Sequence, residues 1–334
     1  MQNKGDTRVA TYAEALAEAL AEILRRDDRV CLIGSSFLGL SSPQHLVTRL
    51  KQEFSSRIFV PPIAEAGFCG LAIGAAMAGL RPIVDLSTAS FIFHAFPQVI
   101  NEAATALYMT GGQTRVPVVF HMLHGIRGGG AAQHSHSPQA MLWNSPGLEI
   151  MLPSSPRDVK GLLKAAVQSE NPTVFLNHTK LFETSGEVPY GEYVIPFGEA
   201  EVKRPGTDVT LLATSLMVHR ALEAARALAS RGVDAEVVDP RTLVPLDKKT
   251  ILQSVAKTGR LVIVDECHRS CGTAAELAAI IADDGFHHLK APIKRVTTPD
   301  VHIPFSPSLE AEVEPTVEKV IAAVMEVLTW KRSA

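Results

Sequence analysis

One acidic side chain stands at the head of a long run of small and apolar residues. In the segment IAEAGFCGLAIGAAMAG, from Ile63 to Gly79, Glu65 is the one charged residue. A carboxylate in apolar surroundings can hold a proton for a base; burial raises its pKa and a helix N-terminus lowers it. Acids are also common in the first turn of a helix, where the macrodipole favours them. Glu65 is therefore a candidate for proton chemistry, with helix stabilisation as the structural alternative.

Several histidines surround a glycine-rich turn in FHMLHGIRGGGAAQHSHSPQAML. They are His121, His124, His134 and His136. Because imidazole titrates near neutral pH, this cluster indicates acid-base chemistry. A zinc site is a weaker interpretation, since HxxH and HxH without a nearby acid match zinc ligand sets poorly. Any one of these rings could also be a structural hydrogen-bonding group.

Glycines weaken the helix that is predicted to follow Glu65. Gly67, Gly70 and Gly74 each cost about 1 kcal/mol relative to alanine in a helix, so roughly 3 kcal/mol is lost locally. Gly70 and Gly74 lie four residues apart and hence on one face, where the missing Cβ atoms let another helix or a ligand approach. This face is therefore either a site of tight helix packing or part of a binding site.

Short apolar strands alternate with helices through the first half of the chain. The predicted strands are 29–34, 57–63, 81–87, 116–123 and 171–178, and the predicted helices are 12–25, a helix from about 64 through the glycine-rich segment, and 96–109. This alternation is typical of parallel strands covered by helices on both faces. The strand before Glu65 would deliver it to the carboxyl edge of the sheet, where α/β proteins bind ligands.

The second half repeats the alternation after a break. Gly, Pro and charged residues concentrate between about 185 and 208, which predicts a linker. The strands predicted beyond it are 209–214, 235–240, 261–266 and 293–299, and the helices are 217–232, 247–259 and 274–285. We therefore predict two α/β domains, at 8–185 and 208–330, joined by a linker at 186–207.

Composition limits the classes of function. The chain has 334 residues and a net charge of −3, without a basic run of the kind that binds nucleic acid. Its longest apolar run, 66–80, falls short of the roughly 20 residues that span a membrane. The opening residues lack the apolar core of a signal peptide, so we expect a cytoplasmic protein with protein and small-molecule partners. The cysteines are expected to be buried thiols, with redox or metal chemistry at Cys267 and Cys271 as the alternative.

The order of several blocks indicates a family. The blocks are PPIAEAGFCGLAIGAAMAGLRPIVD, AAQHSHSPQAMLWNSPGLEIMLPSSPRDVKGLLKAA, NPTVFLNH, RTLVPLDKKTILQSVAKTGRLVIVDE and PFSPSLE. From about Thr11 to Leu328 the chain resembles the beta subunit of the thiamine-diphosphate-dependent decarboxylating component of 2-oxoacid dehydrogenase complexes. That family includes pyruvate, branched-chain 2-oxoacid and acetoin dehydrogenases. The resemblance implies two doubly wound domains, a pyrimidine-binding domain and a transketolase C-terminal domain.

The resemblance also implies roles for individual residues. Glu65 matches the glutamate that hydrogen-bonds N1′ of the cofactor's aminopyrimidine and so activates the cofactor. Ile63 is expected beside the same ring, and Phe91 matches the aromatic residue that packs on it. His134 matches the histidine assigned to proton transfer around the substrate and to acylation of a lipoyl group.

Partners follow from the same resemblance. An alpha subunit is expected to supply the sites for the diphosphate and Mg²⁺ in an α2β2 assembly, and a lipoyl-bearing acyltransferase is expected to accept the acyl group. This chain lacks a GDG…N motif of the kind that binds Mg²⁺ and diphosphate. We therefore expect no metal ligands in it.

The chain departs from the family at three places. GSS, from Gly34 to Ser36, stands where many members have GED, so this chain lacks the acids that form their proton path at this position. Pro97 replaces an acid in FPQ, and His121 replaces an arginine. An imidazole compensates only partly for a guanidinium. We expect an altered substrate pocket that involves His121, His124 and Arg127.

These features leave alternative functions open. The leading hypothesis is a half-enzyme that decarboxylates a 2-oxoacid, or cleaves an acyloin such as acetoin, and passes the product to a lipoyl acceptor. A second is a transketolase-like carboligase that transfers a two-carbon ketol unit to another acceptor. A third is a non-catalytic partner subunit, which the presence of Glu65 and His134 disfavours.

Overall fold

The computed structural model describes residues 6–34 and 44–331, which form two compact units. The first contains the described residues up to His124 together with Leu142–Phe197, and the second contains Gly125–Met141 and the described residues from Gly198 onward. Ser35 and Ser36, part of the predicted departure from the family, lie outside the described residues. Within the described part of the chain, no helix is both long and apolar enough to cross a membrane.

The first unit contains a sheet in which the strands run in the order β6-β7-β5-β4-β2-β3. These strands are β6 (Glu149–Met151), β7 (Thr173–His178), β5 (Val119–His124), β4 (Arg81–Thr88), β2 (Val30–Gly34) and β3 (Ile58–Phe59). All of these neighbours pair in parallel. Because these strands are parallel, the carboxyl ends of β3, β4 and β5 lie at one edge of the sheet. The chain that follows them contains Glu65 after β3, Phe91 after β4 and the glycine-rich histidine segment after β5.

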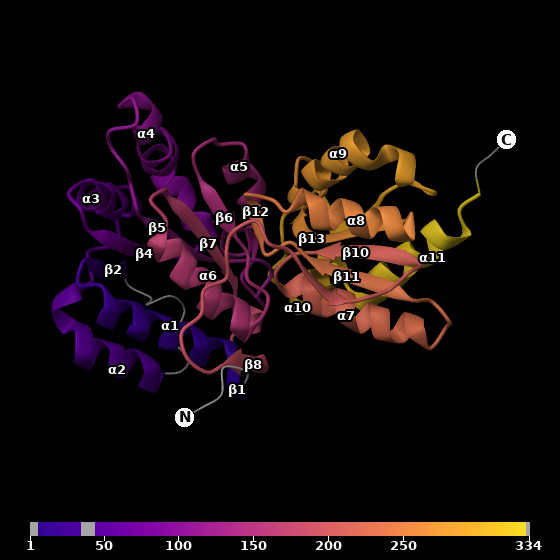
Figure 1. Cartoon of the computed structure of the whole chain (residues 1–334), viewed down its shortest axis with the longest axis horizontal. Coiled ribbons are helices and arrows are strands. Elements are labelled where there is room, and N and C mark those ends of the chain that lie inside the picture. The colour runs from indigo at the N-terminus through magenta and orange to yellow at the C-terminus, as the bar shows by residue number, and fades with distance from the viewer. Residues whose placement is uncertain (1–5, 35–43, 332–334) are drawn as a thin grey trace. The chain divides into compact units, whose positions relative to one another are not determined.

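Helices cover this sheet on both faces (Figure 1). α1 (Tyr12–Arg26) packs against α6 (Pro156–Gln168) and α2 (Gln44–Phe54), whereas α3 (Glu65–Met77) packs against β4. α1 begins with a capping box, in which Thr11 and Glu14 satisfy each other's backbone N–H. α6 begins with Ser155 as its cap and Pro156 at its first position. Local signals thus set where these helices start.

The second unit has a sheet with the order β14-β13-β10-β11-β9. Its strands are β14 (Lys294–Thr298), β13 (Leu261–His268), β10 (Val209–Ala213), β11 (Ala235–Asp239) and β9 (Glu201–Arg204). β9 pairs antiparallel with β11, and the other pairs are parallel. α7 (Leu216–Ala229) and α11 (Val317–Thr329) pack together, as do α8 (Lys248–Thr258) and α9 (Thr273–Gly285), and Figure 1 shows α7 and α8 on opposite faces.

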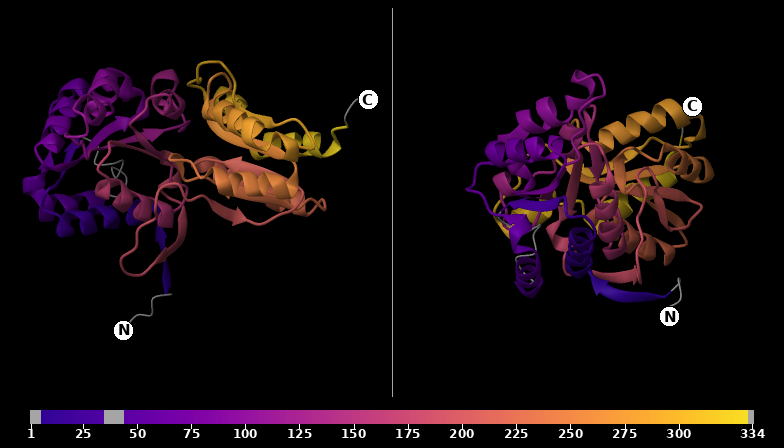
Figure 2. Two further views of the ribbon diagram at one scale, coloured as in Figure 1. Left: turned by 45° about the horizontal axis from the view of Figure 1, so that its top comes forward. Right: turned by 60° about the vertical axis from the view of Figure 1, so that its left-hand side comes forward.

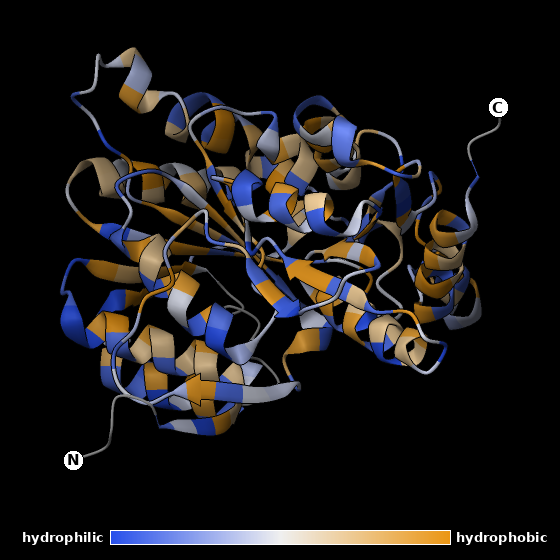
Figure 3. Cartoon of the chain, turned by 45° about the vertical axis from the view of Figure 1, so that its right-hand side comes forward, coloured by the Kyte–Doolittle hydropathy of each residue, from blue (hydrophilic) through white to orange (hydrophobic). Residues whose placement is uncertain are grey.

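The central strands of both sheets are mainly hydrophobic, and Figure 3 shows orange residues along the strand ribbons. The edge strands β9 and β14 of the second sheet carry charged residues. In β10 and β11 every residue is buried, as expected for parallel strands covered on both faces. The predicted fold class, two doubly wound α/β domains, is therefore confirmed.

Two segments differ from their predictions. The segment 96–109, predicted as one helix, divides after the 3₁₀ segment η3 (Ala89–Ala95) into the π-helical turn η4 (Gln98–Ala103) and α4 (Ala106–Met109). Pro97 directly precedes the π turn, and proline lacks the N–H that would continue regular helical bonding. The segment predicted as a linker contains β8 (Ser185–Pro189) as well as β9. β8 pairs antiparallel with β1 (Thr7–Thr11), a ribbon that Figure 2 shows apart from the main sheet.

Other elements were not foreseen individually. They are α2, α6, β1, β6, α5 (Gln139–Trp143), β12 (Thr242–Val244) and α10 (Pro307–Val313), together with α11. Most are short, and short elements carry too little periodicity to identify from sequence. The predicted domain boundaries, at 8–185 and 208–330, stay a prediction. The compact units are a different division of the chain, in which Gly125–Met141 groups with the second half.

Candidate active site

Glu65 is the first residue of α3 and is half-buried. Ala64, the residue that caps this helix, provides no side-chain hydrogen bond to its N-terminus. A carboxylate at this position is favoured by the free amide groups of the first turn. Its charge also acts on Cys69 one turn later: burial, and then the Glu65 carboxylate, raise the pKa of that thiol to about 12. Because α3 follows the parallel strand β3, Glu65 lies near the carboxyl edge of the sheet, where ligands bind in this class of fold.

The glycine face of α3 is open within the described chain. A Cβ on Gly70 would lie 3.9 Å from Gln98 Cγ, and a Cβ on Gly74 would meet nothing within 4 Å. Leu71 and Met77 on the same helix are 60% and 45% exposed. Tight packing inside this chain therefore does not explain the glycines, and the face is available to a ligand or another subunit.

Phe91 lies on η3, directly after β4. Its ring is half-buried and stands at 42° to the ring of His94, with 6.4 Å between centroids. Nearby in sequence, Ser90 Oγ and Gln98 Oε1 are buried and have no hydrogen-bond partner among the described residues. Because a buried polar atom without a partner is costly, these two atoms favour a polar ligand or a partner chain at this edge. Ile63, by contrast, is 82% exposed.

A strained turn connects β4 to the segment that carries Phe91. Ser87 has φ of 60°, a left-handed conformation that is uncommon for a residue with a side chain. Asp85 stabilises it, since its Oδ1 accepts the backbone N–H of Ser87 at 2.9 Å. Asp85 is 4% exposed, so this bond forms in a protected environment.

His121 belongs to a buried polar network behind that turn. Its Nδ1 lies 3.5 Å from Asp85 Oδ1, and its Nε2 lies 2.8 Å from Asn177 Nδ2. The Tyr12 hydroxyl donates to Asn177 Oδ1 at 2.5 Å, which leaves the amide nitrogen to donate to His121. The ring of His121 is fully buried in the first unit, where it also packs against Phe175 with 6.3 Å between centroids. Its Nδ1 makes no hydrogen bond among the described residues, so Asp85 acts on it as a nearby charge.

The other histidine of β5 is separated from His121. His124 is 3% exposed, and its ring packs edge-on against His178 with 5.3 Å between centroids. Residues three apart on a strand point to opposite faces, so the fold does not bring His121 and His124 together. Among the described residues, no group of three or more potential ligands could hold a metal ion. A role for His121 and His124 in a substrate pocket stays a prediction.

The segment of residues 125–137, named here the histidine loop, follows β5 and groups with the second unit. Burial lowers the pKa of the Arg127 guanidinium. His134 ends the 3₁₀ turn η5 (Ala132–His134) and is half-buried. Burial, together with His268 and His302, lowers the pKa of His136.

Several polar residues near these sites were not predicted from the sequence. They are Asp85, Asn177, Ser90 and Gln98 in the first unit and Ser135 and Gln139 in the second. Ser135 Oγ and both amide atoms of Gln139 are buried without a partner among the described residues. No spacing pattern joins these residues, because they come from separate elements. Asp85 offered a local signal, since an aspartate often accepts a hydrogen bond from the backbone two residues later in a turn, as it does here from Ser87.

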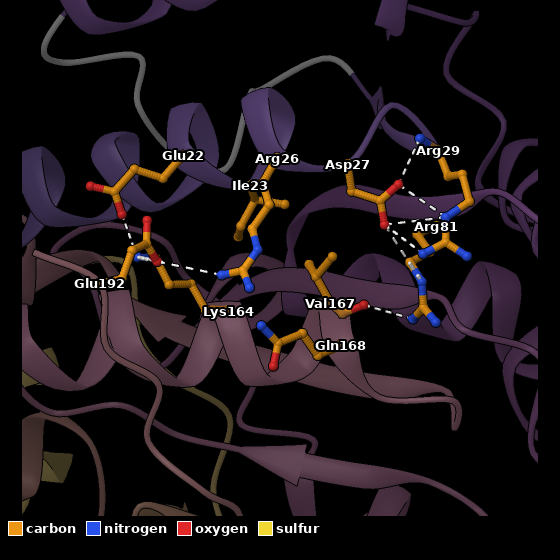
Figure 4. A pocket seen from close by; sticks show the side chains of 10 residues that line it. All are labelled: Glu22, Ile23, Arg26, Asp27, Arg29, Arg81, Lys164, Val167, Gln168 and Glu192. Atoms are coloured by element: carbon orange, nitrogen blue, oxygen red, sulfur yellow. Dashed lines mark hydrogen bonds and ion pairs between the residues drawn. The ribbon is translucent and has the colours of Figure 1, made fainter.

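A cleft of about 400 Å³ lies at the opposite, amino edge of the first sheet (Figure 4). Lys164 is bound there by Glu22 and Glu192, and Arg81 donates to the carbonyl of Val167. Arg29 is paired with Asp27. The charges of this cleft compensate one another, and none of the residues predicted to be functional lines it. We therefore interpret it as a structural ion network and not as the active site.

Comparisons with known proteins identify both domains of the chain. Residues 8–184 match the transketolase pyrimidine-binding domain, and residues 198–320 match the transketolase C-terminal domain. The acetoin:2,6-dichlorophenolindophenol oxidoreductase subunit beta of Bacillus subtilis is 43% identical, with 96% of this chain and 98% of that protein covered. The pyruvate dehydrogenase E1 component subunit beta of Rickettsia felis is 41% identical, with coverage of 95% and 98%.

A solved structure has the same fold. It is described as a split gene transketolase, inactive beta4 tetramer, and it matches with a TM-score of 0.78 and 25% identity. The match covers 96% of this chain and 99% of that one.

Proposed function

Because the chain belongs to the family of E1 beta subunits of 2-oxoacid and acetoin dehydrogenases, we propose that it is one half of a thiamine-diphosphate enzyme. The complete enzyme decarboxylates a 2-oxoacid, or cleaves an acyloin such as acetoin, and passes the acyl or aldehyde unit to a lipoyl acceptor. Thiamine diphosphate supplies the carbon nucleophile for this chemistry.

The position of Glu65 carries this proposal. It is a half-buried carboxylate at the N-terminus of α3, at the ligand-binding edge of a parallel sheet, beside a helix face that the described chain leaves open. In the proposed role Glu65 holds a proton at N1′ of the pyrimidine ring. Phe91 packs on that ring, and Ser90 and Gln98 offer a hydroxyl and an amide carbonyl to its polar edge.

His134 has the second proposed role. A half-buried imidazole can move a proton near neutral pH, which suits proton transfer at the substrate. Arg127 in the same loop offers a cation for a substrate carboxylate. His121 contributes indirectly in this proposal, through Asp85 and the turn at Ser87.

The partner subunit completes the site. The names of the relatives as beta subunits imply an alpha subunit. We propose that it supplies the Mg²⁺ and diphosphate ligands, that the assembly is α2β2, and that a lipoyl-bearing acyltransferase accepts the product. The glycine face of α3 supports a contact with another subunit, since nothing in the described chain lies within 4 Å of a Cβ placed at Gly74.

Calorimetric titration of thiamine diphosphate with Mg²⁺ tests the shared site. We expect binding to the complex of this chain with its alpha subunit and none to this chain alone. Tight binding to the isolated chain would contradict a shared site, and absence of binding in both would favour a non-catalytic subunit. Product analysis of the complex with a lipoyl acceptor and with a sugar acceptor then separates the dehydrogenase function from a carboligase.

A further inference from the structure

The histidine loop is attached to carboxylates that lie far from it in the sequence. Ile126 N donates to Glu266 Oε1 at 3.2 Å, across 140 residues. Gly129 N donates to Glu310 Oε2 at 2.9 Å, across 181 residues. Glu266 lies in β13 and Glu310 in α10, so two separate elements of the second unit hold the first half of the loop.

Both carboxylates are buried. Glu266 is 6% exposed and Glu310 is 3% exposed. Withdrawing a carboxylate from water is costly unless it is hydrogen-bonded, so such groups are retained where their bonds matter. A bond from a backbone N–H to a carboxylate is charge-assisted and about twice as strong as a neutral one. The loop amides are therefore well-matched partners for these two side chains.

The end of the loop is attached as well. The Cys267 thiol donates to the carbonyl of Ser137 at 3.2 Å, and burial followed by the nearby Asp265 raises the pKa of this thiol well above its usual value. Gly125 N donates to the carbonyl of His136 at 3.2 Å, which closes the loop on itself. The proton that makes the Cys267 bond is thus retained at neutral pH.

The conformation of the loop explains why it needs these attachments. Gly125, Gly128, Gly129 and Ala131 all have positive φ. Glycines lose more conformational entropy on ordering than other residues, and a left-handed alanine is strained. At Gly130 a Cβ would lie 3.1 Å from the carbonyl oxygen of His134, so the turn packs directly against the residue that carries the imidazole.

We propose that Glu266 and Glu310 are positioning residues for His134. Their hydrogen bonds hold the backbone at Ile126 and Gly129 and so fix the glycine turn. Because that turn packs against the carbonyl of His134, it sets where the His134 backbone lies. The inference rests on the proposed function, in which His134 moves a proton at the substrate. Neither carboxylate is proposed to contact substrate or cofactor.

Alanine and glutamine variants of the two residues test this in the complex with the alpha subunit. For Glu266→Ala and Glu310→Ala we expect acyl transfer to a lipoyl probe to fall roughly 10- to 100-fold, since a small misplacement of a catalytic group has effects of this size. Hydrogen exchange at residues 125–137 should accelerate, while the affinity for thiamine diphosphate stays within about twofold. Glu266→Gln and Glu310→Gln keep an acceptor oxygen and should recover most of the loss. Glu312→Ala, at an exposed acid on the same helix as Glu310, is the matched control.

A double variant separates positioning from general stability. If Glu266 acts through His134, adding Glu266→Ala to His134→Ala should cost little further activity. Fully additive losses of activity in the double variant would overturn the proposal, as would an unchanged rate of hydrogen exchange at residues 125–137 in the single alanine variants. It would also be overturned if the alanine variants lost protection from exchange throughout the chain and the glutamine variants did not restore it. If the wild-type complex turns over neither 2-oxoacids nor acetoin, the proposed function fails. The exchange measurement still decides whether the two carboxylates hold the loop.

Discussion

Glu65 and His134, the two residues assigned to proton chemistry, are positioned by different means. Glu65 begins the 13-residue helix α3, which packs against β4, so regular local structure sets its place. His134 ends a 3-residue turn inside a glycine-rich loop, and distant carboxylates hold that loop. A helix terminus depends mainly on its own residues, whereas a loop depends on its attachments. Changes outside the site should therefore disturb His134 more than Glu65.

The largest effect is expected from a change at Glu65 itself. Glu65→Gln keeps the size of the side chain but removes its ability to hold a proton at the cofactor. We expect turnover by the complex to fall by roughly 10²- to 10⁴-fold, the range for loss of acid-base catalysis, with assembly unchanged in size-exclusion chromatography. Glu183→Gln, at an exposed acid of the same unit, is the control and should be neutral. Near-normal activity in Glu65→Gln would remove the central assignment.

The next effect concerns the open face beside Glu65. Gly74→Leu adds a side chain where the described chain has nothing within 4 Å. The isolated chain should gain stability, by up to about 1 kcal/mol from helix propensity, in urea unfolding. Assembly with the alpha subunit should weaken, because the added bulk blocks close approach.

Gly74→Ala provides the matched comparison for this face. It raises helix propensity with less bulk, so it should assemble better than the leucine variant. If Gly74→Leu assembled as well as the wild type, another subunit would not contact this face.

The smallest effect is expected at the histidine loop as the pH falls. Burial and the nearby His268 and His302 lower the pKa of His136, so the folded loop favours the neutral ring. The stability that this contributes is present above the ordinary histidine pKa and is lost as the pH falls through the lowered value. Hydrogen exchange at residues 125–137 should accelerate from pH 7.5 to pH 5.5 relative to α3, after correction for the intrinsic rate. In His136→Gln this difference between the loop and α3 should shrink, and an unchanged difference would assign the pH effect to another group.

The fold was largely predictable because its strands and main helices carry strong periodic signals. The apolar runs of β10, β11 and β13 and the spacing in α1 predicted these elements within a few residues. Prediction failed at 96–109, where Pro97 directly precedes a π-helical turn, and at β8 and β9. The edge pairings of β8 and β9 depend on distant strands, which leave no periodic trace in a short segment.

For the site, the residues themselves were easier to predict than their surroundings. The structure locates Glu65 at the start of α3, where a helix was predicted from about residue 64, and it locates Phe91 directly after β4. The burial of His121 and its contacts with Asp85 and Asn177 could not be predicted, because these residues lie on three strands. Their roles in catalysis remain predictions for the experiments above.

The sequence by itself determined the two α/β domains, the family, and the candidates Glu65, Phe91 and His134, since these depend on local periodicity and on motifs whose residues are adjacent in the chain. Only the tertiary structure decided that the histidine loop groups with the second unit and that Glu266 and Glu310 hold it. Those contacts join residues 140 and 181 positions apart. Folding creates such proximity through the packing of whole elements, and no local sequence signal encodes it.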